Sequence, residues 1–144
     1  MFAKIFAPFA AALLCAAALL LPQLAERSLL FAGAQSYTFY AQSASSQAQI
    51  VQATPQQAFA VKLTLCGLTG ESAQYESVEE AFSQAQKYGA TLAFAERAAD
   101  VENYYYYSPR LPGGVEIGGQ RVNLHVAVRG GRAAVGSPLI FGGY

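Results

Sequence analysis

Among the residue types that can do chemistry, histidine titrates closest to neutral pH, and this chain has one, His125. A hydrolase of glycan or peptide would pair it with a carboxylate, for which the candidates are Glu71, Glu96 and Glu116. Ser137 is a poor nucleophile candidate, because its surroundings, VGSPL, lack the Gly-x-Ser-x-Gly turn that exposes a catalytic serine. The sequence keeps this hydrolase as an alternative hypothesis and assigns no catalytic residue.

Four consecutive tyrosines, residues 104–107, form the most distinctive aromatic stretch of the chain. On a strand, Tyr104 and Tyr106 point to one face, while Tyr105 and Tyr107 point to the other. One pair can pack under a helix, and the outward pair suits a half-buried position in which each hydroxyl stays in water. Exposed aromatic pairs on a rigid sheet suit sugars or peptides. The predicted ligand-contacting residues are Tyr105, Tyr107, Arg110, Arg121, Asn123 and His125.

Composition argues against several other classes of function. One histidine and two cysteines leave only scattered carboxylates without the spacing of metal ligands, so we expect no metal and no cofactor. The formal net charge is zero, and attraction to phosphates requires clustered Lys and Arg, so a nucleic-acid partner is disfavoured. Cys66 follows Leu65 in an apolar stretch, and we expect it to be a buried apolar residue.

Residues 1–34 are predicted to be a signal peptide or an N-terminal membrane anchor. Lys4 precedes an uncharged run, residues 5–21, whose length is near the lower limit for a membrane-spanning helix. The small-x-small pattern of residues 32–34 is a site that a signal peptidase could cut, so cleavage and anchoring both stay open. In either case residues 35–144 are expected to form one extracytoplasmic domain, secreted or held at the outer face of the cytoplasmic membrane. A cell-envelope glycan, peptide or protein is the expected partner, with membrane contact only through the uncleaved apolar run.

The pattern of apolar residues predicts an antiparallel β-sheet with one amphipathic helix packed on one face, which is an α+β fold. The helix is predicted at about 78–88, because Ser77 and Glu80 form a capping box and Gly89 can end the helix. Strands are predicted at 36–41, 48–53, 59–66, 91–96, from about 103 through the tyrosines, 115–117, 121–129 and 132–136.

Residues 54–66 give conflicting signals. Thr54-Pro55 is typical of a helix start, whereas apolar side chains occupy every second position from 59 to 65. A helix would split this apolar set into two stripes separated by Lys62, so we predict a strand at 59–66.

Alternation also assigns side chains to faces in two other strands. In the strand at 121–129, the valines and the leucine point inward, while Asn123 and His125 point to solvent. In the strand at 91–96, Leu92 and Phe94 share one side.

The C-terminal part of the chain carries several short motifs. They are Tyr107-Ser108-Pro109, Asn123-Leu124 with Ala127, Gly136-Ser137-Pro138-Leu139-Ile140 and the terminal Tyr144. Together they resemble the YwmB-type family of exported proteins from spore-forming Gram-positive bacteria. The resemblance implies a fold like the saddle-shaped sheet-and-helix unit of TATA-box-binding proteins, and it supplies no established catalytic residues.

The leading hypothesis from the sequence is a non-enzymatic extracytoplasmic domain of the bacterial cell envelope. It would bind through its sheet or serve as an accessory to wall or spore proteins. The alternative is the hydrolase that uses His125 and a nearby carboxylate.

Overall fold

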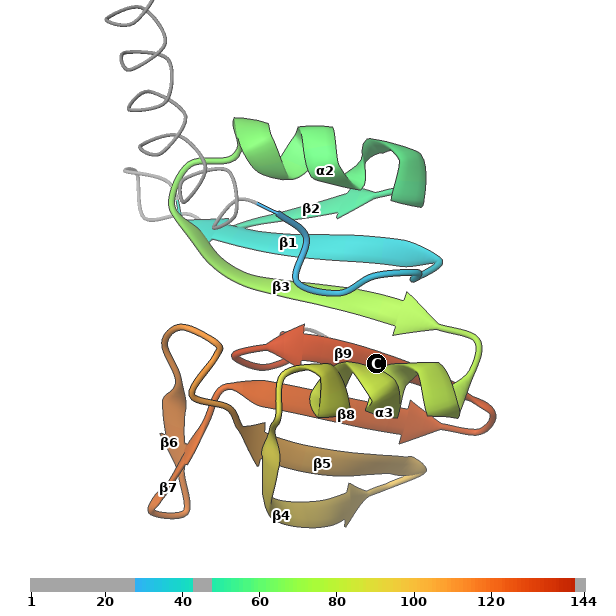
Figure 1. The fold of residues 1–144 in the computed structure, drawn as a ribbon, viewed down its shortest axis with the longest axis vertical. Helices are drawn as coiled ribbons and strands as arrows, with labels where there is room; N and C mark the ends of the chain where they lie inside the picture. The colour runs from blue at the N-terminus through green and yellow to red at the C-terminus, as the bar shows by residue number, and fades with distance from the viewer. Residues whose placement is uncertain (1–27, 43–47, 142–144) are drawn as a thin grey trace, which may run out of the picture.

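The computed structural model describes residues 28–42 and 48–141, and Figure 1 shows their arrangement. The predicted signal peptide or anchor lies, up to residue 27, outside the described residues. Within the described ranges, no helix is long and apolar enough to cross a membrane. The elements in chain order are β1 (Ser36–Gln42), β2 (Ala48–Ala53), α2 (Pro55–Thr64), β3 (Leu68–Tyr75), α3 (Val78–Lys87), β4 (Thr91–Ala98), β5 (Val101–Tyr107), β6 (Val115–Ile117), β7 (Gln120–Val122), β8 (Leu124–Arg129) and β9 (Arg132–Ser137).

Seven of these strands form one antiparallel sheet, in the order β2-β1-β3-β9-β8-β5-β4. The short strands β6 and β7 form a separate antiparallel hairpin. Within the described residues two helices accompany the sheet, so the predicted α+β fold is confirmed. The single predicted helix is joined by a second one, α2.

Most predicted strands are present. The strands predicted at 36–41, 48–53 and 91–96 are confirmed as β1, β2 and β4, and the tyrosine run lies in β5. The strand predicted at 121–129 is interrupted, because Asn123 separates β7 from β8. The sequence pattern does not predict β3, since its residues, LTGESAQY, include Glu71 and other polar side chains where an apolar alternation is sought.

Residues 55–64 form the helix α2, so the strand predicted at 59–66 is wrong. Pro55 occupies the first turn, as the helix-start signal indicates. Ala58, Val61 and Leu65 belong to the core cluster or pack against it, and Lys62 is buried beside them, so the inward residues recur at helical spacing. Lys62 belongs to this stripe, and treating it as a polar interruption hides the helical period. Cys66, expected to be buried, follows the helix and is exposed.

The helix predicted at 78–88 is confirmed as α3. The hydroxyl of Ser77 caps its N-terminus by accepting a hydrogen bond from the Glu80 N–H (3.4 Å), as the capping box predicts. On its buried face, Phe82 packs edge-on against Tyr104, with ring centroids 5.0 Å apart. The tyrosine run therefore turns one of its two faces toward α3.

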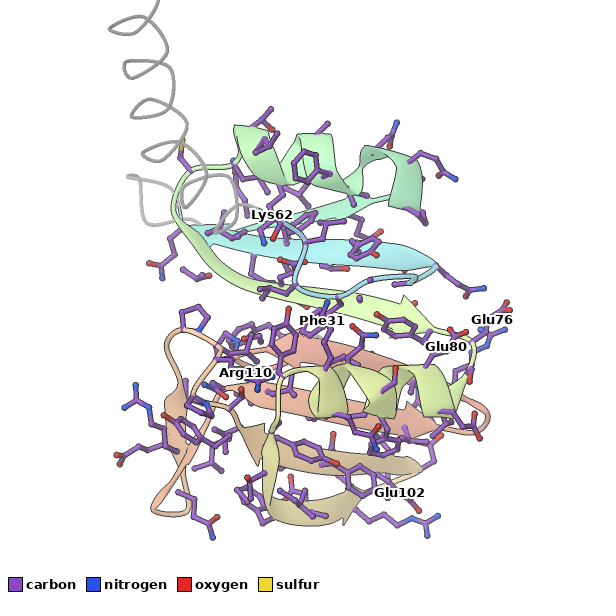
Figure 2. All side chains as sticks on the ribbon, in the orientation of Figure 1. Phe31, Lys62, Glu76, Glu80, Glu102 and Arg110 are labelled. Carbon is purple, nitrogen blue, oxygen red and sulfur yellow. The ribbon has the colours of Figure 1, made fainter. Side chains whose placement is uncertain are left out.

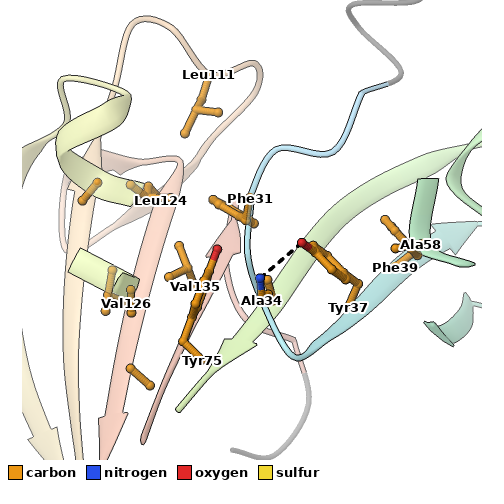
Figure 3. Packing of buried hydrophobic residues seen from close by; sticks show 14 of the residues in the cluster. Phe31, Ala34, Tyr37, Phe39, Ala58, Tyr75, Leu111, Leu124, Val126 and Val135 are labelled. Atoms are coloured by element: carbon orange, nitrogen blue, oxygen red, sulfur yellow. Dashed lines mark hydrogen bonds between the residues drawn. The ribbon is translucent and has the colours of Figure 1, made fainter. Parts of the chain in front are cut away.

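Both helices lie on the same face of the sheet, called the helix side below (Figure 1). The core fills the space between the helices and the sheet (Figure 3), and its large members include Phe39, Tyr75, Leu124, Val126 and Val135. The opposite face, called the far side below, carries neither of the two described helices. The far side is therefore where the sheet can present side chains to a ligand.

Residues 28–34, called the N-terminal segment below, run across the helix side between α2 and α3 (Figure 1, blue). Phe31 is 0% exposed and belongs to the same core cluster as Tyr75 and Val135 (Figure 3). Its ring meets Tyr88 edge-on, with centroids 6.3 Å apart. The predicted domain boundary falls at the start of β1, whereas this preceding segment is also packed into the core.

The N-terminal segment has no regular secondary structure, and side chains of the neighbouring elements bind its backbone. From the sheet, a Glu71 oxygen accepts from the Leu30 N–H (2.9 Å), and the Tyr75 hydroxyl donates to the Ala32 carbonyl (2.6 Å). From α3, Gln84 Oε1 accepts from the Ala32 N–H (3.3 Å). These side chains provide the hydrogen bonds that a partner strand would otherwise supply.

Lys62 and Glu71 form a buried ion pair beside the N-terminal segment. The Nζ–Oε2 distance is 2.6 Å, and the two side chains are 4% and 1% exposed. Lys62 Nζ also donates to the Ser28 carbonyl, and the other Glu71 oxygen accepts from the Leu30 N–H. The pair therefore joins α2, β3 and the N-terminal segment.

Phe31→Ala is expected to lower the free energy of unfolding by about 3–5 kcal/mol, because it leaves a cavity in place of a fully buried ring. Phe59→Ala is the matched control: Phe59 on α2 is 46% exposed, and its loss is expected to change stability by about 0.5 kcal/mol or less. Urea unfolding of the full chain measures both variants. Equal losses for the two would contradict the place of Phe31 in the core.

Lys62→Met and Glu71→Gln are each expected to cost about 3–5 kcal/mol, because each leaves a buried partner without its counter-charge. The double variant is expected to lose less than the sum of the two, since both charges disappear together. Unfolding free energies of the wild type and the three variants complete the cycle. Strictly additive losses would show that the two side chains do not interact.

Candidate functional site

Three side chains form a stacked row across the far side: Phe94 on β4, Tyr105 on β5 and His125 on β8, called the aromatic row below. In the register of the sheet, Phe94 lies opposite Tyr105, and Tyr105 lies opposite His125. The ring centroids are 4.6 Å apart in both contacts, with interplanar angles of 27° and 17°. Stacking at this separation is favourable, so the sheet holds the three rings in one fixed arrangement.

Two polar side chains, Glu96 and Asn103, hold the row in place. Glu96 Oε1 accepts a hydrogen bond from the Tyr105 hydroxyl at 3.0 Å. Burial and this hydrogen bond raise the pKa of Tyr105 to about 12, so the hydroxyl stays protonated at neutral pH. His125 Nδ1 accepts from the Ile140 N–H at 3.2 Å, which leaves Nε2 to donate to Asn103 Oδ1 at 2.8 Å.

His125 is therefore a neutral, hydrogen-bonded side chain. It is 7% exposed, and burial lowers its pKa to about 4. A general acid or base needs a nitrogen that can reach a proton on the substrate. Both nitrogens of this ring are already bound within the protein, so its role here is to hold the row and the chain that covers it.

Residues 138–141, called the C-terminal segment below, cross the far side and cover His125. The predicted solvent exposure of this histidine is therefore wrong, although its face of the strand is as predicted. Gly136 makes room for the crossing, because a Cβ there would lie 2.7 Å from the Leu139 carbonyl oxygen. This segment forms no strand and packs against the sheet as an extended tail.

Asn123 is 0% exposed, so its predicted solvent-facing position is also wrong. Its Nδ2 donates to the carbonyls of Ser108 (2.7 Å) and Leu111 (3.1 Å), and its Oδ1 accepts from the Ser108 N–H (2.8 Å). Both amide donors are thus used to fix the turn that follows β5. Asn123 builds the fold and does not present its side chain to a ligand.

The other predicted ligand-contacting residues do not join the stacked row. Arg110 Nη1 donates to a carbonyl at the C-terminal end of α3, at 3.1 Å (Figure 2). Arg121 Nη2 donates to a carbonyl of the loop before β6, at 3.3 Å. Tyr107 is exposed near the start of β4, two residues along β5 from Tyr105. Of the predicted set, the structure brings Tyr105 and His125 into direct contact.

None of the three carboxylates of the hydrolase hypothesis forms a pair with His125. Glu71 is in the buried ion pair on the helix side, and Glu116 lies in the separate β6–β7 hairpin. Glu96 is near the row, but its hydrogen bond goes to Tyr105 and not to His125. In the part of the chain that the structure describes, no group of three or more His, Cys, Asp or Glu is placed to hold a metal ion. This geometry gives no support to an acid–base pair.

Phe94, Glu96 and Asn103 are site residues that the sequence analysis misses. Strict alternation puts Leu92 and Phe94 on one side, but a β-bulge between them places Phe94 opposite Tyr105, on the far side. No glycine or proline marks the bulge, so the sequence gives no signal for the change of face.

A shallow, open hollow of about 250 Å³ lies at β4 and β5. Its lining residues are Ala95, Glu96, Arg97, Glu102, Asn103 and Tyr104. Two of them, Glu96 and Asn103, are also the hydrogen-bond partners of the row. The side chains of the other four alternate with these two along β4 and β5 and point to the helix side, as Tyr104 does toward α3, so the hollow does not belong to the face that carries the row.

No protein-family model matches the chain, and comparisons with curated proteins and with solved structures find no match. The resemblance to the YwmB-type family, and the fold that it implies, stay predictions. Function must therefore be inferred from the site itself.

The stability of the protein is expected to fall between about pH 6.5 and pH 4 because of His125. Its pKa is about 4 when folded and near 6.5 when unfolded, so the unfolded chain binds more protons in this window. The contribution of neutral His125 is complete above this window and amounts to roughly 3 kcal/mol, which is lost as the pH falls through it.

Urea unfolding midpoints of the wild type and of His125→Gln, measured across the same pH range, check this expectation. The variant removes the titrating ring, so its midpoint is expected to change less with pH than that of the wild type. A variant curve as steep as the wild-type curve would contradict the assignment.

Proposed function

We propose that this chain is a non-enzymatic, extracytoplasmic binding domain of the bacterial cell envelope, and that it binds an uncharged glycan at the aromatic row. The apolar run at residues 5–21 supports export or anchoring. A formal net charge of zero supports an uncharged ligand over a nucleic acid or an acidic polymer.

The observation that carries the proposal is that Tyr105 and His125 are uncharged at neutral pH and fixed in a stacked row. Acid–base catalysis requires a group that exchanges a proton with the substrate. Binding requires a preformed surface, because a rigid site loses less conformational entropy when the ligand arrives. The row provides a preformed surface, but it provides no group that exchanges a proton with a substrate.

The groups around the row suit a sugar. The half-buried ring of Phe94, which ends the row, and the edge of the Tyr105 ring, whose two faces are covered by its neighbours, offer apolar surface to the C–H groups of a sugar ring. The Glu96 carboxylate and the Asn103 amide can hydrogen-bond its hydroxyl groups.

Tyr105→Ala is expected to weaken binding of the full chain to isolated cell-wall glycan by about tenfold or more, which corresponds to about 1.4 kcal/mol. It removes the middle ring of the row, on which both neighbouring rings stack. Glu96→Ala is expected to weaken binding without disturbing the core, because this side chain is exposed. Co-sedimentation with purified wall in mild detergent measures the bound fraction.

Phe59→Ala is the control for a general effect of losing an exposed aromatic ring, since Phe59 lies on α2. Urea unfolding of Tyr105→Ala distinguishes a loss of binding from a loss of folding. Wild-type binding by Tyr105→Ala and Glu96→Ala, or hydrolysis of the glycan by the wild type, would contradict the proposal. Binding to wall peptides but not to glycan strands would contradict the choice of ligand.

A further inference from the structure

The N-terminal segment ends where the sequence predicts a peptidase cut, after Ala34. In the structure the Tyr37 hydroxyl accepts from the Ala34 N–H (3.4 Å, dashed in Figure 3). The next residue, Gln35, donates from its N–H to the Gln74 carbonyl on β3 (2.9 Å). The segment therefore continues directly into the sheet, and the predicted cut falls between two residues that the domain binds.

We propose that the mature protein keeps residues 28–34, and that any cut of the apolar N-terminal run falls before Ser28. This inference rests on the proposed function, because it assumes that residues 5–21 direct export. The proposed function concerns ligand binding, whereas this inference concerns the first residue of the mature chain, which is assigned from the contacts of the N-terminal segment.

A cut after Ala34 would remove Phe31 and leave its place in the core unfilled. It would also remove the two backbone groups that complete the hydrogen bonding of the Lys62–Glu71 pair. A buried charge with fewer partners is strongly destabilising, and a small domain has little stability to lose. A chain that began at Gln35 would therefore lack part of the packing and hydrogen bonding that holds α2 and α3 to the sheet.

The buried hydroxyl of Tyr75 and the amide of Gln84 lead to the same conclusion. Both groups use the backbone of Ala32 as a hydrogen-bond partner. Within the described residues, no buried side-chain nitrogen or oxygen lacks a partner. Removing the segment would leave these groups unpaired in the space between the helices.

The proposal also places the attachment point of any retained N-terminal run. Ser28 lies on the helix side, where its carbonyl accepts from Lys62, and Figure 2 shows Lys62 and Phe31 there. The aromatic row lies on the opposite face of the sheet. An anchor joined at Ser28 would therefore leave the proposed glycan-binding face turned away from the point of attachment.

Intact mass of the full chain recovered from a bacterial host is the first test, with Ala32→Arg as the matched variant. The Ala32 side chain is exposed, so the fold tolerates arginine, whereas the small-x-small pattern of the predicted cut is destroyed. We expect both proteins to begin at the same residue, at or before Ser28. A wild-type chain that begins at Gln35, with uncut Ala32→Arg chain accumulating, overturns the proposal.

Amide hydrogen exchange on the purified full chain is the second test, and it does not depend on export. The Leu30 and Ala32 amides are expected to exchange at least about 100-fold more slowly than in an unstructured peptide. Gln84→Ala removes the acceptor for Ala32 alone, so it is expected to speed exchange there more than at Leu30.

Exchange at the rate of an unstructured peptide overturns the inference, in whichever compartment the chain is found. A protected segment in an uncut chain that stays in the cytoplasm supports the inference and counts against the proposed function. The two proposals can therefore fail separately.

Discussion

The buried Lys62–Glu71 ion pair is the constraint on which the helix side depends. Taking two charges out of water is costly, and their attraction offsets that cost only when their remaining hydrogen-bonding capacity is satisfied. The Ser28 carbonyl and the Leu30 N–H supply those additional hydrogen bonds. As a result α2, β3 and the N-terminal segment depend on one another, because displacing any of them leaves a charged group with fewer partners.

The same pair explains what the sequence could not predict. The sequence identified α3 and most strands, because a cap such as Ser77 and an alternating strand are local signals. It missed α2 and β3, because Lys62 and Glu71 are charged and a charged residue is normally exposed. Each looks like an interruption of an apolar pattern when considered alone. Only their contact across the fold makes both positions part of the core.

Part of the candidate site could be predicted from the sequence, and the rest depends on contacts between distant parts of the chain. Alternation placed Tyr105 and His125 on the outward faces of their strands, and the structure stacks them because those strands, β5 and β8, are paired. Alternation does not predict how exposed a side chain is, because exposure depends on what covers that face of the sheet. In this structure the C-terminal segment covers His125. Phe94 was missed because a β-bulge reverses its side, and such a bulge is set by pairing with β5.

Two adjacent residues of β3 lie against the two ends of the described chain, on opposite faces of the sheet. Glu71 binds Leu30 on the helix side, while Gly70 lies under the C-terminal segment on the far side, where an added Cβ would lie 3.2 Å from the Phe141 ring. Since β3 pairs with both β1 and β9, both terminal segments hold the strand that joins the two halves of the sheet. The C-terminal segment also contacts the aromatic row, because the Ile140 N–H donates a hydrogen bond to His125. A ligand that contacts the rings of Phe94 and Tyr105 can therefore bind without displacing either terminal segment.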